Sequence, residues 1–323
     1  MSEPLLSIRD LSVRVGVSPS APAIIEDISL DLRKGETLGL VGESGSGKST
    51  LGMSILRLAA PALEKGTRGT IHYKGRDIRL LAARDLHRLR GGEISMILQD
   101  PMASLNPVFS IGAQLKEALR RRPGSGNLED AAVQALEEVN IPSPAARLRN
   151  YPHQMSGGMR QRIVSAIALA QAPELLICDE PTTSLDVTIQ FQFLELLADL
   201  QKAHHMAMLF ITHDFGVVAK TCDRVAVMYA GQIVETGPVR EIFHNPRHWY
   251  TRALLASVPR TDAKPHRLAQ IAGSPPSVTN RPAGCRFHPR CPAATALCST
   301  EPQLADIAPG HTLRCWHPAG GVQ

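Results

Sequence analysis

The chain has 323 residues, which is long enough for one large domain and an appendage. Its hydrophobic content of 43% and charged content of 20% are typical of a globular protein. The net charge of +5 allows contact with nucleic acid or an anionic membrane but indicates neither. An apolar run of about 18 residues, which a membrane span needs, is absent from the sequence, and the start carries no basic region followed by an apolar one. We therefore expect a cytosolic protein, in which disulfides are disfavoured.

The first forty residues alternate apolar and polar positions, which is the period of half-buried strands. The apolar positions are Leu6, Ile8, Leu11, Val13, Val15, Ile28, Leu30 and Leu32. Residues 37–41 (TLGLV) are an apolar run bounded by glycines and predict a buried strand. This run leads through a glycine-rich stretch into residues 51–60, which are apolar and of helical length.

The later sequence alternates between strand-like and helix-like segments. Helices are expected at 114–122, 129–139 and 188–202, and strands at 175–178, 208–212 and 225–229. Such alternation predicts an α/β core with a largely parallel sheet, interrupted by a helical insert at about 100–160. From about residue 258, Pro, Cys, His and Arg dominate and periodicity fades, which indicates a loop-rich tail.

Residues 42–49 (GESGSGKS) fit the pattern G-x-x-x-x-G-K-[ST]. Glycines let the backbone turn tightly and bring N–H groups against phosphate oxygens. Lys48 adds a positive charge for the β- and γ-phosphates, and Ser49 offers a hydroxyl to Mg²⁺. Because the stretch follows a buried-type strand and precedes a helix, it predicts a phosphate-binding loop rather than an accidental turn. The expected ATP-binding residues are Gly42, Glu43, Ser44, Gly45, Ser46, Gly47, Lys48, Ser49 and Thr50.

Residues 175–180 (LLICDE) are an apolar run that ends in two carboxylates. Many strands end in acids, so the pattern has weight only because a phosphate-binding loop is also present. Beside such a loop, Asp179 can lie near Mg²⁺, and Glu180 can orient an attacking water molecule.

Six motifs stand in a characteristic order along the chain. They are the 42–49 loop, Gln99 in ILQDP, SGGMRQR at 156–162, CDEP at 178–181, TSLD at 183–186 and ITHD at 211–214. A serine and two glycines before a helix predicted at 163–170 would alone indicate only a helix cap or an anion site. Together the motifs resemble those of ATP-binding cassette (ABC) proteins, and the resemblance runs from about residue 5 to 257.

The resemblance implies an α/β fold of the ABC type over residues 5–257, with a RecA-like P-loop core, an antiparallel β subdomain and a helical subdomain. It implies catalytic roles for Glu180, His213 and Gln99, and Mg²⁺ binding through Ser49, Gln99 and Asp179. The signature that caps the ATP of a partner subunit would be Ser156, Gly157, Gly158 and Met159, and the interface aspartate would be Asp186.

Two positions depart from the usual family pattern. Val15 stands where an aromatic residue usually stacks on adenine, which predicts weaker discrimination of ATP from GTP. Met159 replaces the usual glutamine of the signature, although methionine is familiar in the branch that imports peptides.

Four of the six cysteines lie near the end of the chain, namely Cys285, Cys291, Cys298 and Cys315. Four neighbouring thiolates can hold Zn²⁺ or an iron–sulfur cluster, and the C-x2-C spacing typical of structural zinc is absent here. The other two, Cys178 and Cys222, are expected to be buried small residues.

The residues around these cysteines resemble the C-terminal extension of oligopeptide and dipeptide importer ATPases. The matching stretches are 245–259, 271–276 and GCRFHPRCP at 284–292, and the resemblance covers about 240–318. It implies a 258–323 extension with a [4Fe–4S] cluster on the four cysteines, Zn²⁺ being the alternative.

The resemblance implies the ATP-hydrolysing subunit of an importer for di- and oligopeptides, at the cytoplasmic face of the inner membrane. The implied partners are a second ATPase subunit, usually a paralogue, two permease subunits and an extracytoplasmic solute-binding protein, with no nucleic acid. Nickel or another small solute is an alternative cargo. A DNA-associated ABC ATPase is disfavoured, because the short segment between Gln99 and Ser156 cannot hold a long coiled coil.

Overall fold

The computed structural model describes residues 3–18, 20–122, 124, 126–183, 185–258 and 270–320. The chain divides into two compact units. The first unit comprises Met1–Leu32, Thr37–Arg79 and Ile211–Gln323, and the second comprises Arg33–Glu36 and Leu80–Phe210.

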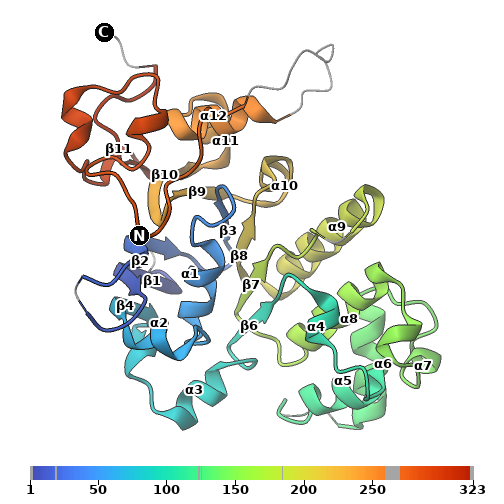
Figure 1. Cartoon of the computed structure of the whole chain (residues 1–323). Coiled ribbons are helices and arrows are strands. Elements are labelled where there is room, and N and C mark those ends of the chain that lie inside the picture. The colour runs from blue at the N-terminus through green and yellow to red at the C-terminus, as the bar shows by residue number, and fades with distance from the viewer. Residues whose placement is uncertain are drawn as a thin grey trace. The chain divides into compact units, whose positions relative to one another are not determined.

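One sheet of the first unit is antiparallel, and its strands β1 and β2 lie where the early alternation predicts strands (Figure 1). Its strands, in the order β2-β1-β4-β5, are β1 (Leu6–Arg14), β2 (Ala23–Leu32), β4 (Thr67–Tyr73) and β5 (Arg76–Asp77). Leu6, Ile8, Leu11 and Val13 are buried, since alternate side chains of a strand face the core. Val15 lies beyond the end of β1 and is 50% exposed.

A second group of strands in the first unit flanks the phosphate-binding loop. These strands, in the order β11-β12-β10-β9-β3, are β3 (Thr37–Val41), β9 (Arg224–Tyr229), β10 (Gln232–Pro238), β11 (Ala305–Ala308) and β12 (His311–Leu313). β3 is buried along its whole length and pairs in parallel with β9, as expected for a strand covered on both faces. The helices of this unit are α1 (Lys48–Ile55), α2 (Pro61–Lys65), α10 (Phe215–Thr221), α11 (Val239–His244) and α12 (Trp249–Ser257).

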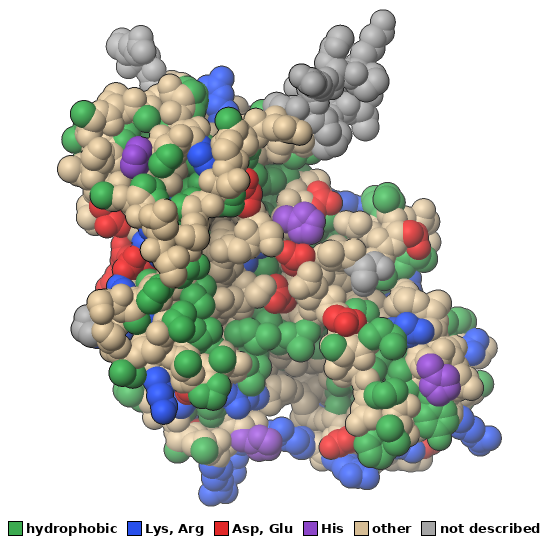
Figure 2. All heavy atoms as spheres, viewed as in Figure 1, with side chains coloured by type: hydrophobic (Ala, Val, Ile, Leu, Met, Phe, Trp, Pro, Cys, Tyr) green, Lys and Arg blue, Asp and Glu red, His purple; other side chains and the backbone are tan. Residues whose placement is uncertain are grey.

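The second unit contains three strands and a group of helices. The strands are β6 (Ile94–Ile97), β7 (Leu175–Asp179) and β8 (Ala207–Thr212), the last of which ends in the first unit. The helices are α3 (Ala83–Leu89), α4 (Pro101–Ser104), α5 (Ile111–Leu119), α6 (Leu128–Glu138), α7 (Pro144–Arg147), α8 (Gly157–Leu169) and α9 (Val187–His204). Helices α5 to α8 gather into one cluster (Figure 1). Over the helices of this unit, acidic and basic side chains are interspersed on the face drawn in Figure 2.

The predicted strands and helices are present, with boundaries that local capping explains. α8 begins at Gly157, six residues earlier than the predicted start, because the Ser156 side chain accepts a hydrogen bond from the Met159 amide and caps the helix. The tail also contains strands β11 and β12, which its sequence pattern does not predict. Among the described residues, the model has no helix of the length and apolarity that a membrane span requires.

Candidate functional site

The loop between β3 and α1 has the backbone geometry of a phosphate cradle. Gly42, Gly45 and Gly47 have φ angles of 156°, 78° and 102°. A Cβ on Gly42 would lie 2.0 Å from the carbonyl oxygen of Met228, and one on Gly47 would lie 2.5 Å from a methyl carbon of Ile25. Gly42 and Gly47 therefore require glycine both for conformation and for space, and Gly45 requires it for conformation alone.

Polar groups inside this loop are arranged to receive an anion. Lys48 is 5% exposed, and its Nζ donates to the carbonyl oxygens of Gly42 at 2.8 Å and Glu43 at 3.1 Å. The Ser46 hydroxyl is buried without a hydrogen-bond partner and lies 3.0 Å from the position of a Cβ on Gly42. A buried hydroxyl without a partner is costly, so a phosphate oxygen at this place would satisfy it. The loop thus fits the phosphates of a nucleoside triphosphate, and Ser49, the predicted Mg²⁺ ligand, lies in the first turn of α1.

Gln99 and Glu180, each predicted to be catalytic, meet in the second unit. β6 and β7 run parallel, with Ile97 opposite Cys178. Gln99 and Glu180 each lie two positions beyond this pair and therefore at the same edge of the sheet. Gln99 Nε2 donates to Glu180 Oε2 at 3.3 Å. Asp179 is 4% exposed at the end of β7.

The Glu180 carboxylate has a further partner that sequence reasoning did not single out. Thr183 Oγ1 donates to Glu180 Oε2 at 3.0 Å. Glu180 itself has φ of 46°, an uncommon conformation for a residue other than glycine, and such strain is concentrated at functional sites. Thr183 was noted only as the first residue of TSLD, in which Ser184 lies outside the described residues. Its position three residues after a strand-end glutamate is the signal that could have identified it.

The residues predicted to form the signature and the residue predicted as the interface aspartate both contact Ile189 of α9 or its backbone. The Asp186 side chain accepts from the Ile189 amide at 3.0 Å and caps α9. A Cβ on Gly158 would lie 2.7 Å from Cγ2 of the same Ile189. A Cβ on Gly157, in contrast, would meet no atom within 4 Å. The two glycines therefore differ in purpose, since Gly158 permits close helix packing.

His213 is exposed between β8 and α10 in the first unit. The next residue, Asp214, caps α10 by accepting hydrogen bonds from the amides of Gly216 and Val217. This cap fixes the turn from which the His213 side chain projects.

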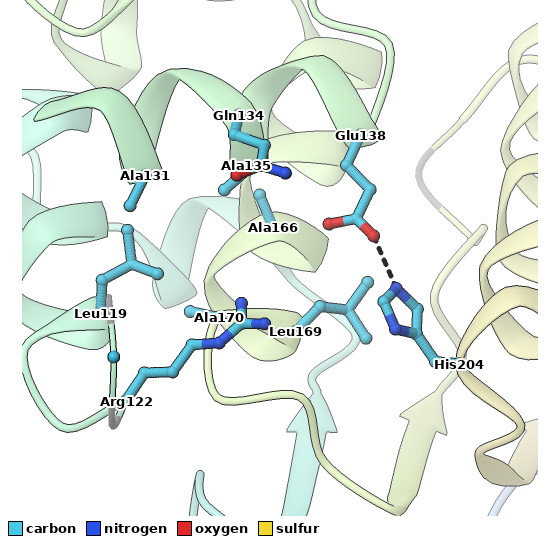
Figure 3. A pocket seen from close by; sticks show the side chains of 11 residues that line it. Leu119, Arg122, Ala131, Gln134, Ala135, Glu138, Ala166, Leu169, Ala170 and His204 are labelled. Atoms are coloured by element: carbon cyan, nitrogen blue, oxygen red, sulfur yellow. Dashed lines mark hydrogen bonds and ion pairs between the residues drawn. The ribbon is translucent and has the colours of Figure 1, made fainter. Parts of the chain in front are cut away.

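A separate cavity of about 340 Å³ lies among helices of the second unit (Figure 3). Leu119, Ala166 and Leu169 contribute apolar walls, and His204 and Glu138 are paired at 2.6 Å at one side. Among its described lining residues there are none of the predicted ATP-site residues.

The expectation of an iron–sulfur cluster or zinc on four cysteines is wrong. Cys285, Cys291, Cys298 and Cys315 all lie in the described part of the chain, where no group of three or more His, Cys, Asp or Glu residues could hold a metal ion. Cys285 and Cys291 instead pack against an apolar cluster that includes Phe287. Burial raises the pKa of Cys315 to about 12 and also raises the pKa of Cys285 and of Cys291.

A glycine cradle with a buried lysine, and a strand-end glutamate held by a glutamine, define a P-loop ATPase. Two family models agree with this class: residues 25–183 match "ABC transporter", and residues 234–298 match "Oligopeptide/dipeptide transporter, C-terminal region". The chain belongs to the oligopeptide/dipeptide group of ABC transporter ATP-binding proteins and is an ATPase.

Relatives and a solved structure are similar over most of the chain. A probable peptide ABC transporter ATP-binding protein of Sinorhizobium fredii is 47% identical, over 97% of this chain and 94% of the relative. The dipeptide transport ATP-binding protein DppD of Bacillus subtilis is 45% identical, over 97% of this chain and 95% of the relative. Neither description names an iron–sulfur protein. The structure of cbiO1 from Clostridium perfringens, part of an ABC transporter complex, superposes with a TM-score of 0.64 at 25% identity and covers 76% of this chain and 92% of that chain.

Proposed function

We propose that this ATPase energises the import of di- and oligopeptides across the cytoplasmic membrane. The observation that carries the motor function is the hydrogen bond from Gln99 to Glu180 at the carboxyl ends of two parallel strands. Peptide cargo is supported by the match of residues 234–298 to a peptide-transporter region and by relatives whose names specify peptide or dipeptide transport.

In this proposal the residues of the loop bind the triphosphate. The backbone N–H groups of residues 44–50 contact phosphate oxygens, and Lys48 Nζ turns from the loop carbonyls to the β- and γ-phosphates. Mg²⁺, held through Ser49, Gln99 and Asp179, would neutralise charge on the phosphates. Most of the catalytic effect is then positioning and charge stabilisation.

Glu180 is the proposed residue that orients the attacking water molecule. Its carboxylate accepts hydrogen bonds from Gln99 and Thr183, which hold it in one orientation and leave oxygen lone pairs for water. His213 contacts the γ-phosphate. Ser156, Gly157, Gly158 and Met159 cap the nucleotide of a second subunit, with Asp186 at the interface between subunits.

The proposed assembly follows from having one phosphate loop and one signature in the chain. The phosphate loop and the signature each complete an ATP site only together with a second ATPase subunit. We propose that this second subunit is a paralogue of this chain. Two permease subunits and an extracytoplasmic solute-binding protein complete the importer, and the ATPase lies on the cytoplasmic face of the membrane. Residues 5–257 form the ATP-binding domain, with its core, antiparallel β subdomain and helical subdomain, and residues 258–323 form the extension.

The test is ATP hydrolysis by the complete transporter in liposomes with its solute-binding protein. Peptides of two to about five residues should stimulate hydrolysis and accumulate inside the vesicles, whereas nickel should do neither. Glu180→Gln should retain ATP binding and lower turnover about 100-fold or more, which is the usual contribution of a residue that activates the nucleophile.

Glu174→Gln is the matched control, because Glu174 stands just before β7 and pairs with Lys34 on the surface. It should leave turnover unchanged. Normal hydrolysis by Glu180→Gln would refute the assignment of Glu180, and stimulation by nickel in place of peptides would refute the cargo.

A further inference from the structure

Glu43, the second residue of the phosphate loop, is held by the C-terminal part of the chain. Its backbone N–H donates to Tyr250 Oη at 2.8 Å. Its carboxylate accepts two hydrogen bonds from Arg290, from Nη1 at 2.8 Å and from Nη2 at 3.1 Å. A bidentate arginine–carboxylate pair fixes orientation as well as distance.

Arg290 is itself fixed in place. Its side chain is 5% exposed, and Nε donates to the carbonyl oxygen of Ala272 at 2.9 Å. Nη1 also donates to Tyr229 Oη at 3.2 Å. Because the guanidinium is a planar fork, these bonds leave it a single orientation, with its two Nη atoms directed at Glu43.

Tyr250 is positioned by aromatic packing. The residue is fully buried in α12, and its ring centroid lies 4.5 Å from that of Tyr229 and 5.4 Å from that of Phe287. The oxygen of the Tyr250 hydroxyl accepts the Glu43 N–H, and burial raises the pKa of this hydroxyl. The hydroxyl thus presents a fixed acceptor to the loop.

These contacts bear on how the loop receives phosphate. The Glu43 carbonyl accepts from Lys48 Nζ, a bond that is given up when the lysine turns to a phosphate. Tyr250 and Arg290 hold the N–H and the carboxylate of Glu43, and these bonds do not depend on Lys48. A loop that is kept in its binding conformation loses less entropy when it binds a ligand.

We propose that Tyr250 and Arg290 are positioning residues that preorganise the phosphate-binding loop through Glu43, so that helix α12 and the C-terminal segment 270–320 together set the affinity for nucleotide. This inference rests on the proposed binding of ATP by the loop. Neither residue is assigned a contact with nucleotide.

The experiment measures ATP and ADP binding to the full-length chain by calorimetry, and KM and kcat of the complete transporter. Arg290→Ala should raise Kd about tenfold, the scale of one lost charge-assisted hydrogen bond. Tyr250→Phe should raise it about threefold, since it removes a neutral bond. KM should rise in parallel while kcat at saturating ATP stays within about twofold, because the groups that act in the transition state are untouched.

Arg314→Ala is the matched control. Arg314 belongs to the same segment and is equally buried, at 4% exposed, but it pairs with Asp27 and Glu301. It should leave Kd unchanged. Equal weakening by Arg314→Ala, or a wild-type Kd in folded Arg290→Ala, would overturn the proposal.

A second measurement covers the case in which Arg290→Ala does not fold. Arg290→Lys should retain part of the affinity, and Glu43→Gln should weaken binding while making Arg290→Lys nearly neutral, because the two changes act on one pair. Hydrogen exchange of the Glu43 amide should accelerate in Tyr250→Phe and not in Arg314→Ala. Additive effects of Glu43→Gln and Arg290→Lys on Kd would refute the proposal. An unchanged exchange rate of the Glu43 amide in Tyr250→Phe would refute it as well.

Lys48→Ala separates this inference from the proposed function. If the wild-type chain binds no nucleotide, or Lys48→Ala binds as well as the wild type, the proposed function fails. If Lys48→Ala abolishes binding while the Arg290 and Tyr250 variants bind normally, only the present inference fails.

Discussion

The Glu235 carboxylate is completely buried, and its partners come from distant parts of the sequence. Oε1 lies 2.9 Å from His311 Nε2 and accepts from the Arg247 amide at 2.7 Å. Oε2 accepts from the His248 amide at 3.0 Å. Burial opposes ionisation, but these hydrogen bonds outweigh it and lower the pKa of Glu235. A single carboxylate thereby ties β10 to β12 and to the start of α12.

His248, beside this carboxylate, should make stability depend on pH. Its Nδ1 accepts from the Tyr250 amide at 3.1 Å and caps α12, which requires an unprotonated nitrogen. Complete burial lowers the pKa of His248 to about 4, whereas an unfolded histidine has a pKa of about 6.5. The unfolded state binds the proton first, so stability is lost as pH falls from about 6.5 towards 4, by up to about 3 kcal/mol.

The measurement is urea unfolding of the wild type and of His248→Asn at pH 7 and pH 5. Asparagine can cap a helix but does not titrate, so the variant should lose less stability between these pH values. Glu235 titrates below this window because its pKa is lowered. The exposed control His87→Asn should follow the wild type. An unchanged pH dependence in His248→Asn would show that His248 is not the titrating group.

At the scale of elements, the packing of α8 on α9 depends on the missing side chain of Gly158. An added methyl group would meet Ile189 Cγ2 at 2.7 Å. Gly158→Ala should therefore destabilise the isolated chain by about 1–3 kcal/mol, the usual cost of overpacking. Ile189→Ala in the same chain should recover part of this loss, because it removes the obstructing carbon.

Gly157→Ala is the control for helix propensity, since its methyl group would meet open space one residue earlier. It should be neutral or slightly stabilising. Thermal unfolding measures the stability of the wild type, of the two single glycine variants and of the double variant Gly158→Ala/Ile189→Ala. Equal losses of stability in Gly157→Ala and Gly158→Ala would show that the cost comes from backbone conformation and not from the packing of α8 on α9.

At the scale of the whole molecule, the C-terminal segment is part of the apolar core of the first unit. Phe287 is 1% exposed and packs in one cluster with Val41, at the end of β3, and with Tyr229 and Tyr250. Phe287→Ala should cost about 3–5 kcal/mol, as large-to-small core changes do. The control Leu297→Ala, at a position 47% exposed, should cost less than about 0.5 kcal/mol.

Chemical unfolding followed by far-ultraviolet circular dichroism measures both variants. Because the chain has two compact units, more than one unfolding transition is expected. The loss of stability in Phe287→Ala should appear in only one of these transitions. If Phe287→Ala is no less stable than Leu297→Ala, the segment contributes little to the core.

Contiguous features of this protein could be predicted from sequence alone. The phosphate loop is set by three glycines within six residues, and the early strands are set by alternation in Leu6–Arg14 and Ala23–Leu32. Both depend on local backbone preferences and on the period of side-chain burial, which a sequence displays directly. The resemblance to ABC proteins rested on the order of such local motifs.

Contacts between distant residues were decided only by the tertiary structure. Gln99 meets Glu180 because of the register of β6 on β7, and Arg290 reaches Glu43 across 247 positions of sequence. The four cysteines are close in sequence, yet Cys285 and Cys291 pack as apolar groups and the predicted metal site is not formed. Sequence spacing determines which side chains are available, but the packing of the core determines which of them point at one another.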